Sequence, residues 1–145
     1  MPVTDEQVAS LRAQLSRQPE EHLRLFNLLD HESKKTGYQA LVSAAFVVAV
    51  QRRFASGAGM EEVMEFVGGV RSRSSLAADQ LDPVIAERVI MSVLADDSLD
   101  DVDARQSFQA QLVLMAAIVG DEDLEDAGLD AFLAQARKLA DKWLG

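Results

Sequence analysis

Residues 38–54, with the sequence YQALVSAAFVVAVQRRF, form the most apolar segment of the chain. Within the run 40–50 the only polar side chain is that of Ser43, so no face of a helix here would suit water. The length of the segment and its four alanines favour a helix over a strand. We therefore expect a buried central helix over about 38–54. A second one is expected over about 104–119, because the run 112–119 is also apolar throughout.

Local capping signals place further helices on either side of these two. Thr4 followed by Gln7 has the spacing of a capping box, which predicts a helix start at the N-terminus. Pro19 suits the first turn of a second helix, for which Gly37 offers a glycine stop. Asp82-Pro83 combines an N-cap residue with a proline at the first helical position.

A glycine pair and a last apolar stripe complete the expected set of helices. Gly68-Gly69 predicts a kink or an end in the helix that follows the loop 56–59. A final helix carries an apolar stripe formed by Leu129, Phe132, Leu133, Ala136, Leu139, Ala140 and Trp143. We therefore predict an all-α fold, with a single globular bundle of six or seven helices around the two buried ones. This bundle would form one domain over residues 1–145.

The composition excludes several classes of function. The absence of cysteine removes disulfides and cysteine-ligated metals and fits a cytoplasmic protein. The longest apolar run has eleven residues, whereas a membrane span needs about 20. Residues 76–145 carry fifteen acidic and five basic side chains, which account for the whole net charge of −10. This half would repel nucleic acid and attract a basic protein.

Two acidic segments share one design and are the first candidate sites. VIMSVLADDSLDD (89–101) and VLMAAIVGDEDLED (113–126) each join an apolar run to an acidic turn, a leucine and two more acids. Converging carboxylates bind hard cations such as Ca²⁺ or Mg²⁺, although the spacing is not that of an EF-hand. The candidate metal ligands are Asp96, Asp97, Asp100, Asp121, Asp123, Glu125 and Asp126. The alternative interpretation is helix capping, with Ser98 and Asp123 as N-caps.

The same acidic half supplies the candidate partner-binding residues, which are Asp100, Asp101, Asp103, Glu122 and Trp143. Trp143 continues the last apolar stripe, so we expect it in the core. The alternative is that it is exposed and anchors a partner. The apolar content of 48% with only 26% charged residues also leaves a homodimer open.

Candidate catalytic residues are absent from the pattern, and no cofactor is predicted. His22 and His31 are nine residues apart, about 180° around one helix, so they would not share a ligand. A small-molecule or enzyme site would need a cavity between helices, with Phe46, Met64, Met91 or Met115 in its lining.

Three functional hypotheses follow. The first is a small acidic helical protein that works by protein–protein contact, as a regulator, adaptor or immunity-like neutraliser of a basic partner. The second is a divalent-cation-binding domain, and the third is the site in an inter-helix cavity.

Overall fold

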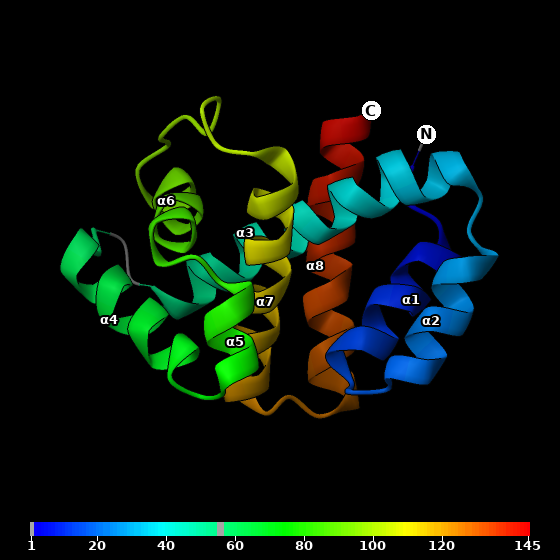
Figure 1. Cartoon of the computed structure of the whole chain (residues 1–145). Helices are drawn as coiled ribbons and strands as arrows, with labels where there is room; N and C mark the ends of the chain where they lie inside the picture. The colour runs from blue at the N-terminus through cyan, green and yellow to red at the C-terminus, as the bar shows by residue number, and fades with distance from the viewer. Residues whose placement is uncertain (1, 55–56) are drawn as a thin grey trace. The chain divides into compact units, whose positions relative to one another are not determined.

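The computed structural model describes residues 2–54 and 57–145, and these residues form helices and no strand (Figure 1). The helices are α1 (Asp5–Leu15), α2 (Pro19–Leu28), α3 (Tyr38–Arg53), α4 (Met60–Arg71), α5 (Ser75–Gln80), α6 (Pro83–Leu94), α7 (Ala104–Glu122) and α8 (Asp126–Leu144), with one π-helical segment, η1 (Ser33–Gly37). The all-α prediction is confirmed. Among the described residues, no helix combines the length and the apolar character needed to cross a bilayer.

The chain divides into two compact units, which are described separately below. Unit 1 comprises the chain up to Val48 together with Glu122–Gly145, and unit 2 comprises Ala49–Asp121. The single-domain organisation over residues 1–145 stays a prediction.

The two helices predicted to be buried carry much of the apolar core. In α3 every side chain from Leu41 to Val50 is buried or half-buried. In α7 the buried residues include Leu114, Met115 and Ile118, while Ala116 on the opposite side is exposed. The prediction of two buried helices is confirmed, and α7 is buried along one side only.

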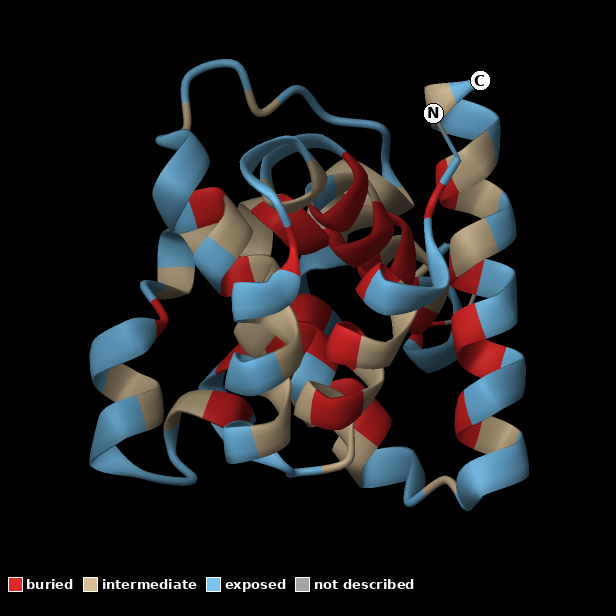
Figure 2. Cartoon of the chain, turned by 90° about the vertical axis from the view of Figure 1, so that its right-hand side faces the viewer, coloured by how far each residue is buried: buried red, intermediate tan, exposed pale blue. Residues whose placement is uncertain are grey.

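In unit 1, α1 packs against α2 and α8. The capping box forms as predicted, because the Thr4 hydroxyl accepts from the Gln7 N–H (3.2 Å) and the Gln7 side chain accepts from the Thr4 N–H (2.9 Å). The buried stripe of α8 consists of Leu129, Phe132, Leu133, Ala136 and Ala140, and Figure 2 shows it along one side of the helix that ends at the C-terminus.

The predicted second helix is shorter than expected. It ends at Leu28, because Leu29 is extended (φ −72°, ψ 140°). The Asp30 carboxylate then accepts from the Ser33 N–H (2.8 Å), and the chain continues helically through η1 into α3. The predicted stop at Gly37 is therefore wrong. Gly37 is buried inside the π-helical segment, where a Cβ atom would collide with the Gln7 side chain.

In unit 2, α4 packs against α5 and α6 (Figure 1). The buried side chains of α4 are Val63, Phe66, Val67 and Val70. The helix continues through Gly68-Gly69 to Arg71, so the predicted end at the glycines is wrong. The predicted start of α6 is confirmed, with the Asp82 carboxylate accepting from the Ile85 N–H (3.0 Å).

The short helix α5 was not predicted, because six residues give no clear periodicity. Its N-cap is Ser74, whose hydroxyl accepts from the Ala77 N–H (3.0 Å). At its other end the Arg71 guanidinium donates to the carbonyls of Leu81 (2.8 Å) and Ala78 (3.3 Å). These two hydrogen bonds tie the end of α4 to the end of α5.

Candidate functional site

The first acidic junction is the loop Ala95–Asp103, which joins α6 to α7 in unit 2. Arg88 of α6 holds it with a bidentate ion pair to Asp101, at 2.8 Å for each nitrogen–oxygen pair, and with a hydrogen bond to the Ser98 carbonyl (3.1 Å). The hydrogen bond from Arg88 lowers the pKa of the Asp101 carboxyl. Asp103 is the N-cap of α7, since its carboxylate accepts from the Gln106 N–H (3.0 Å). The loop is thus fastened at its C-terminal half.

The other three carboxylates of this junction face solvent. Asp96, Asp97 and Asp100 are exposed, and within the described part of the chain none of their carboxylates forms an ion pair or a hydrogen bond. Asp96 adopts a left-handed conformation (φ 57°) immediately after the C-cap of α6, which aspartate tolerates better than most residues. This loop therefore carries three exposed carboxylates that have no ion pair and no hydrogen bond in the described residues. Asp97 is still attracted to the Arg88 guanidinium, because its charge contributes to the raised pKa of Arg88.

The second acidic junction differs from the first in its backbone. Here α7 continues to Glu122, and the left-handed residue is Asp123 (φ 50°), directly before the shared leucine. In the first junction the left-handed residue lies three positions before that leucine.

The predicted N-caps at Ser98 and Asp123 are wrong. The true N-caps are Asp103 and Glu125, and Glu125 makes no side-chain capping hydrogen bond. Ser98 instead stabilises a turn, with its hydroxyl accepting from the Asp100 N–H (3.2 Å).

Two carboxylates of the second junction, and Asp130 in the first turns of α8, have basic partners. In unit 2, Arg73 pairs with Asp121 at 2.8 Å. In unit 1, Arg12 of α1 pairs with Asp130 at 2.8 Å and with Asp126 at 3.3 Å, and these contacts raise the pKa of Arg12. Glu122 also has a partner within the chain, so it is not a free carboxylate. Asp123 and Glu125 are exposed without an ion pair in the described residues.

The predicted metal ligands do not form a metal site in the described residues. No group of three histidine, aspartate or glutamate side chains there could hold a metal ion. Asp96, Asp97 and Asp100 point to solvent from a loop of unit 2, whereas Asp126 is held by Arg12 in unit 1. The geometry therefore gives the cation-binding hypothesis no support, and that hypothesis stays a prediction.

Trp143 is 50% exposed, so its predicted place in the core is wrong. The N-terminal segment packs against this end of α8 instead. Val3 is only 1% exposed, and its N–H donates to the Asp141 carboxylate (2.6 Å). Its carbonyl accepts from Arg137 (2.8 Å), which also pairs with Asp5. Trp143 thus has the exposure that the alternative, partner-anchoring interpretation requires.

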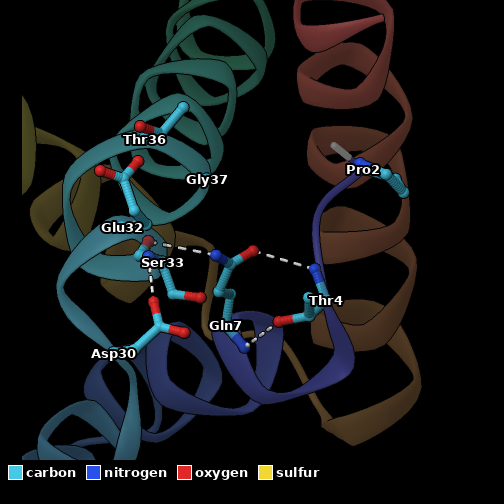
Figure 3. Close-up of a pocket in the computed structure, with 8 residues that line it drawn as sticks. All are labelled: Pro2, Thr4, Gln7, Asp30, Glu32, Ser33, Thr36 and Gly37. Atoms are coloured by element: carbon cyan, nitrogen blue, oxygen red, sulfur yellow. Dashed lines mark hydrogen bonds between the residues drawn. The ribbon is translucent and has the colours of Figure 1, made fainter.

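A pocket of about 260 Å³ lies beside η1 in unit 1 (Figure 3). Gln7 crosses it, with its amide donating to the Ser33 carbonyl (3.1 Å), the same carbonyl that accepts the Tyr38 N–H. The other residues of its lining are Pro2, Thr4, Asp30, Glu32, Ser33, Thr36 and Gly37. Sequence reasoning missed this pocket, because it forms where two distant segments meet.

The residues predicted to line a small-molecule site differ in exposure. Phe46 and Met115 are fully buried side chains, whereas Met64 is 52% exposed. The small-molecule hypothesis stays a prediction.

One pair of side chains has the composition of a nucleophile and base but not the geometry. His22 Nδ1 lies 2.8 Å from the Ser10 carbonyl oxygen and 3.2 Å from the Ser10 hydroxyl. A ring nitrogen that donates to a carbonyl carries a proton, so it cannot accept the serine proton. Tyr38 lies beside this pair, and burial raises its pKa to about 12. This cluster therefore packs α1 against α2 and α3 rather than forming a catalytic centre.

No family model, curated protein or solved structure matches the chain. What supports a function is therefore the charge, exposure and pairing of the chain's own side chains.

Proposed function

We propose that this protein acts by binding another protein with a basic contact surface, through the loop Ala95–Asp103. The observation that carries this proposal is the group of three exposed, unpaired carboxylates of Asp96, Asp97 and Asp100. Each would gain a cationic partner on binding without breaking an ion pair or a hydrogen bond in the described residues. Binding a basic surface here therefore incurs no loss of existing ion pairs.

The way the loop is held supports the proposal. The bidentate pair between Arg88 and Asp101 and the N-cap at Asp103 fix one end of the loop in the free protein. A loop that is already ordered loses less conformational entropy when a partner binds.

The net negative charge of unit 2 also favours a basic partner. It carries twelve acidic and six basic side chains. Three of the six basic side chains have partners within the unit: Arg73 and Arg88 form ion pairs, and Arg71 donates to backbone carbonyls. The resulting negative field would speed the approach of a basic partner, and salt would screen it.

The experiment is a pull-down with the intact protein, eluted in rising salt, followed by affinity measurement on the recovered partner. The variant D96N/D97N/D100N removes the unpaired charges of the loop. The variant E20Q/D123N/E125Q changes the net charge by the same amount at exposed sites elsewhere and serves as the matched control.

We expect the loop variant to weaken binding at least about tenfold at low salt, with the control close to wild type. At about 1 M salt, where the Debye length is about 3 Å, wild type and loop variant should converge. Equal weakening by both variants would show that only net charge matters. Undiminished binding by the loop variant would refute the proposal.

A further inference from the structure

The solvent-facing side of α4 exposes methionines in a regular stripe. Met60 is 43% exposed and Met64 is 52% exposed, and they lie four residues apart. Gly68, also exposed, follows at the same spacing. Residues at i and i+4 share a helix face, so the stripe is continuous over two turns. It adjoins the face that packs in unit 2 through Val63 and Val67.

An acidic edge runs beside this stripe. At about 100° per residue, Glu61 and Glu65 project from the helix next to Gly68, on the side away from the buried face. Both are exposed, and neither forms an ion pair or hydrogen bond in the described residues. The surface therefore offers a flexible apolar strip with negative charge along one side, here called the α4 face (Met60, Glu61, Met64, Glu65 and Gly68).

Among the described residues, no close neighbour requires glycine at positions 68 and 69 of α4. A Cβ atom at Gly68 or Gly69 would meet no heavy atom within 4 Å. Glycine in a helix interior lowers stability relative to alanine, so two in succession are unfavourable unless something needs the room. A partner whose backbone approaches closely would need it.

We propose that the α4 face docks a basic amphipathic helix of another protein, with its apolar side on the methionines and its lysines or arginines against Glu61 and Glu65. This goes beyond the proposed function, because it names a second surface, separate from the loop Ala95–Asp103, and the chemistry of what binds there. Methionine surfaces adapt to varied apolar helices, and an amphipathic helix lying on an apolar groove is a recurring recognition mode.

Charge decides between this occupant and a second copy of the chain. A symmetric dimer through the α4 face would place the glutamates of two copies side by side. The arginine at the end of the helix could not compensate, because the Arg71 guanidinium already donates to the Leu81 and Ala78 carbonyls. A cationic helix meets no such repulsion.

The test uses a fluorescently labelled peptide of leucine and lysine, about 18 residues long, which is long enough to form a helix on binding. The same residues are rearranged in a second peptide so that no apolar face forms. A third peptide has glutamate in place of lysine. Binding to the full chain is followed by fluorescence anisotropy, and light scattering reports the oligomeric state.

We expect the amphipathic basic peptide to bind at least about tenfold more tightly than either control peptide. The variant M60Q/M64Q should weaken it by a similar factor. The control L23Q/L28Q removes two leucines of α2 that are more exposed than the methionines and should leave binding unchanged. E61Q/E65Q should weaken binding and flatten its dependence on salt.

Gly68→Ala separates docking from stability. This variant should raise the melting temperature, because alanine favours the helix. It should nevertheless lower the affinity for the peptide. Wild-type affinity in M60Q/M64Q would overturn the proposal. So would a dimer that this variant dissociates, since the occupant would then be a second copy.

The loop variant D96N/D97N/D100N distinguishes this inference from the proposed function. If it loses the recovered partner but keeps the peptide, both proposals stand. If it loses the peptide as fully as E61Q/E65Q, the α4 face is not the docking site. If it keeps the recovered partner while M60Q/M64Q loses the peptide, only the loop proposal fails.

Discussion

The two acidic junctions have nearly the same sequence but different surroundings. The loop Ala95–Asp103 keeps one arginine partner, Arg88, and leaves three carboxylates unpaired. The second junction receives Arg73 from the chain after α4 and Arg12 from α1, which together pair with three of its acids. The difference lies in basic residues that are remote in sequence. The same acidic pattern therefore fastens helices in one place and presents charge to solvent in the other.

The largest expected effect is the loss of stability when the leucine that both junctions share is replaced by alanine. Leu99 and Leu124 are both half-buried, and a Cβ atom at Gly128 of α8 would lie 3.3 Å from the Leu124 side chain. Deleting a fully buried leucine side chain costs about 2–5 kcal/mol, so we expect about 1–2 kcal/mol for Leu99→Ala and for Leu124→Ala. Urea unfolding measures it. As a control, Leu28→Ala at a 71% exposed position should leave the free energy of unfolding nearly unchanged. Unequal losses for Leu99→Ala and Leu124→Ala would show that the two junctions do not depend on their leucine in the same way.

A smaller effect separates the junctions by their ion pairs. Arg12→Gln removes both contacts of Arg12, to Asp126 and Asp130, and should lower the free energy of unfolding by about 0.5–1 kcal/mol. The loss should shrink as salt rises, because these pairs are exposed. Arg24→Gln, which removes an exposed pair with Glu21 inside α2, should have less effect. A loss that salt does not change would contradict a role in ion pairing.

The smallest effect is the pH dependence at Asp101. Its pKa is lowered in the folded protein by the hydrogen bond from Arg88, from an ordinary value of 3.8. The ionised carboxylate therefore adds stability above that value, and the contribution disappears as the pH falls through the lowered pKa. A carboxyl titration by NMR should show a lower midpoint for Asp101 in wild type than in Arg88→Gln. Identical midpoints would mean that the pair does not persist in solution.

The parts of this fold that sequence predicts are those governed by neighbours in the chain. The capping box at Thr4 and the start at Asp82-Pro83 depend on residues within one turn, and both form as predicted. The stripe of α8 depends on spacing alone, and its members up to Ala140 are buried except Leu139, which is half-buried. Its last member, Trp143, is exposed, whereas Val3, whose N–H donates to Asp141 of the same helix, is buried.

The candidate site was less predictable, because pairing depends on residues far away in sequence. The acidic loop was visible in the sequence, but which of its carboxylates stay unpaired depends on the reach of Arg88. Arg12 and Asp130 are 118 residues apart, and neither has a pattern that points to the other. Glycine was also ambiguous: Gly37 suggested a helix end but instead makes room for Gln7.

Val3 and Gln7 connect segments that are far apart in the sequence. The Val3 N–H is bonded to a carboxylate 138 positions away, and the Gln7 amide to a carbonyl 26 positions away. Removing Val3 would therefore take away its hydrogen bonds with Asp141 and Arg137 of α8, and removing Gln7 as well would take away a hydrogen bond to η1.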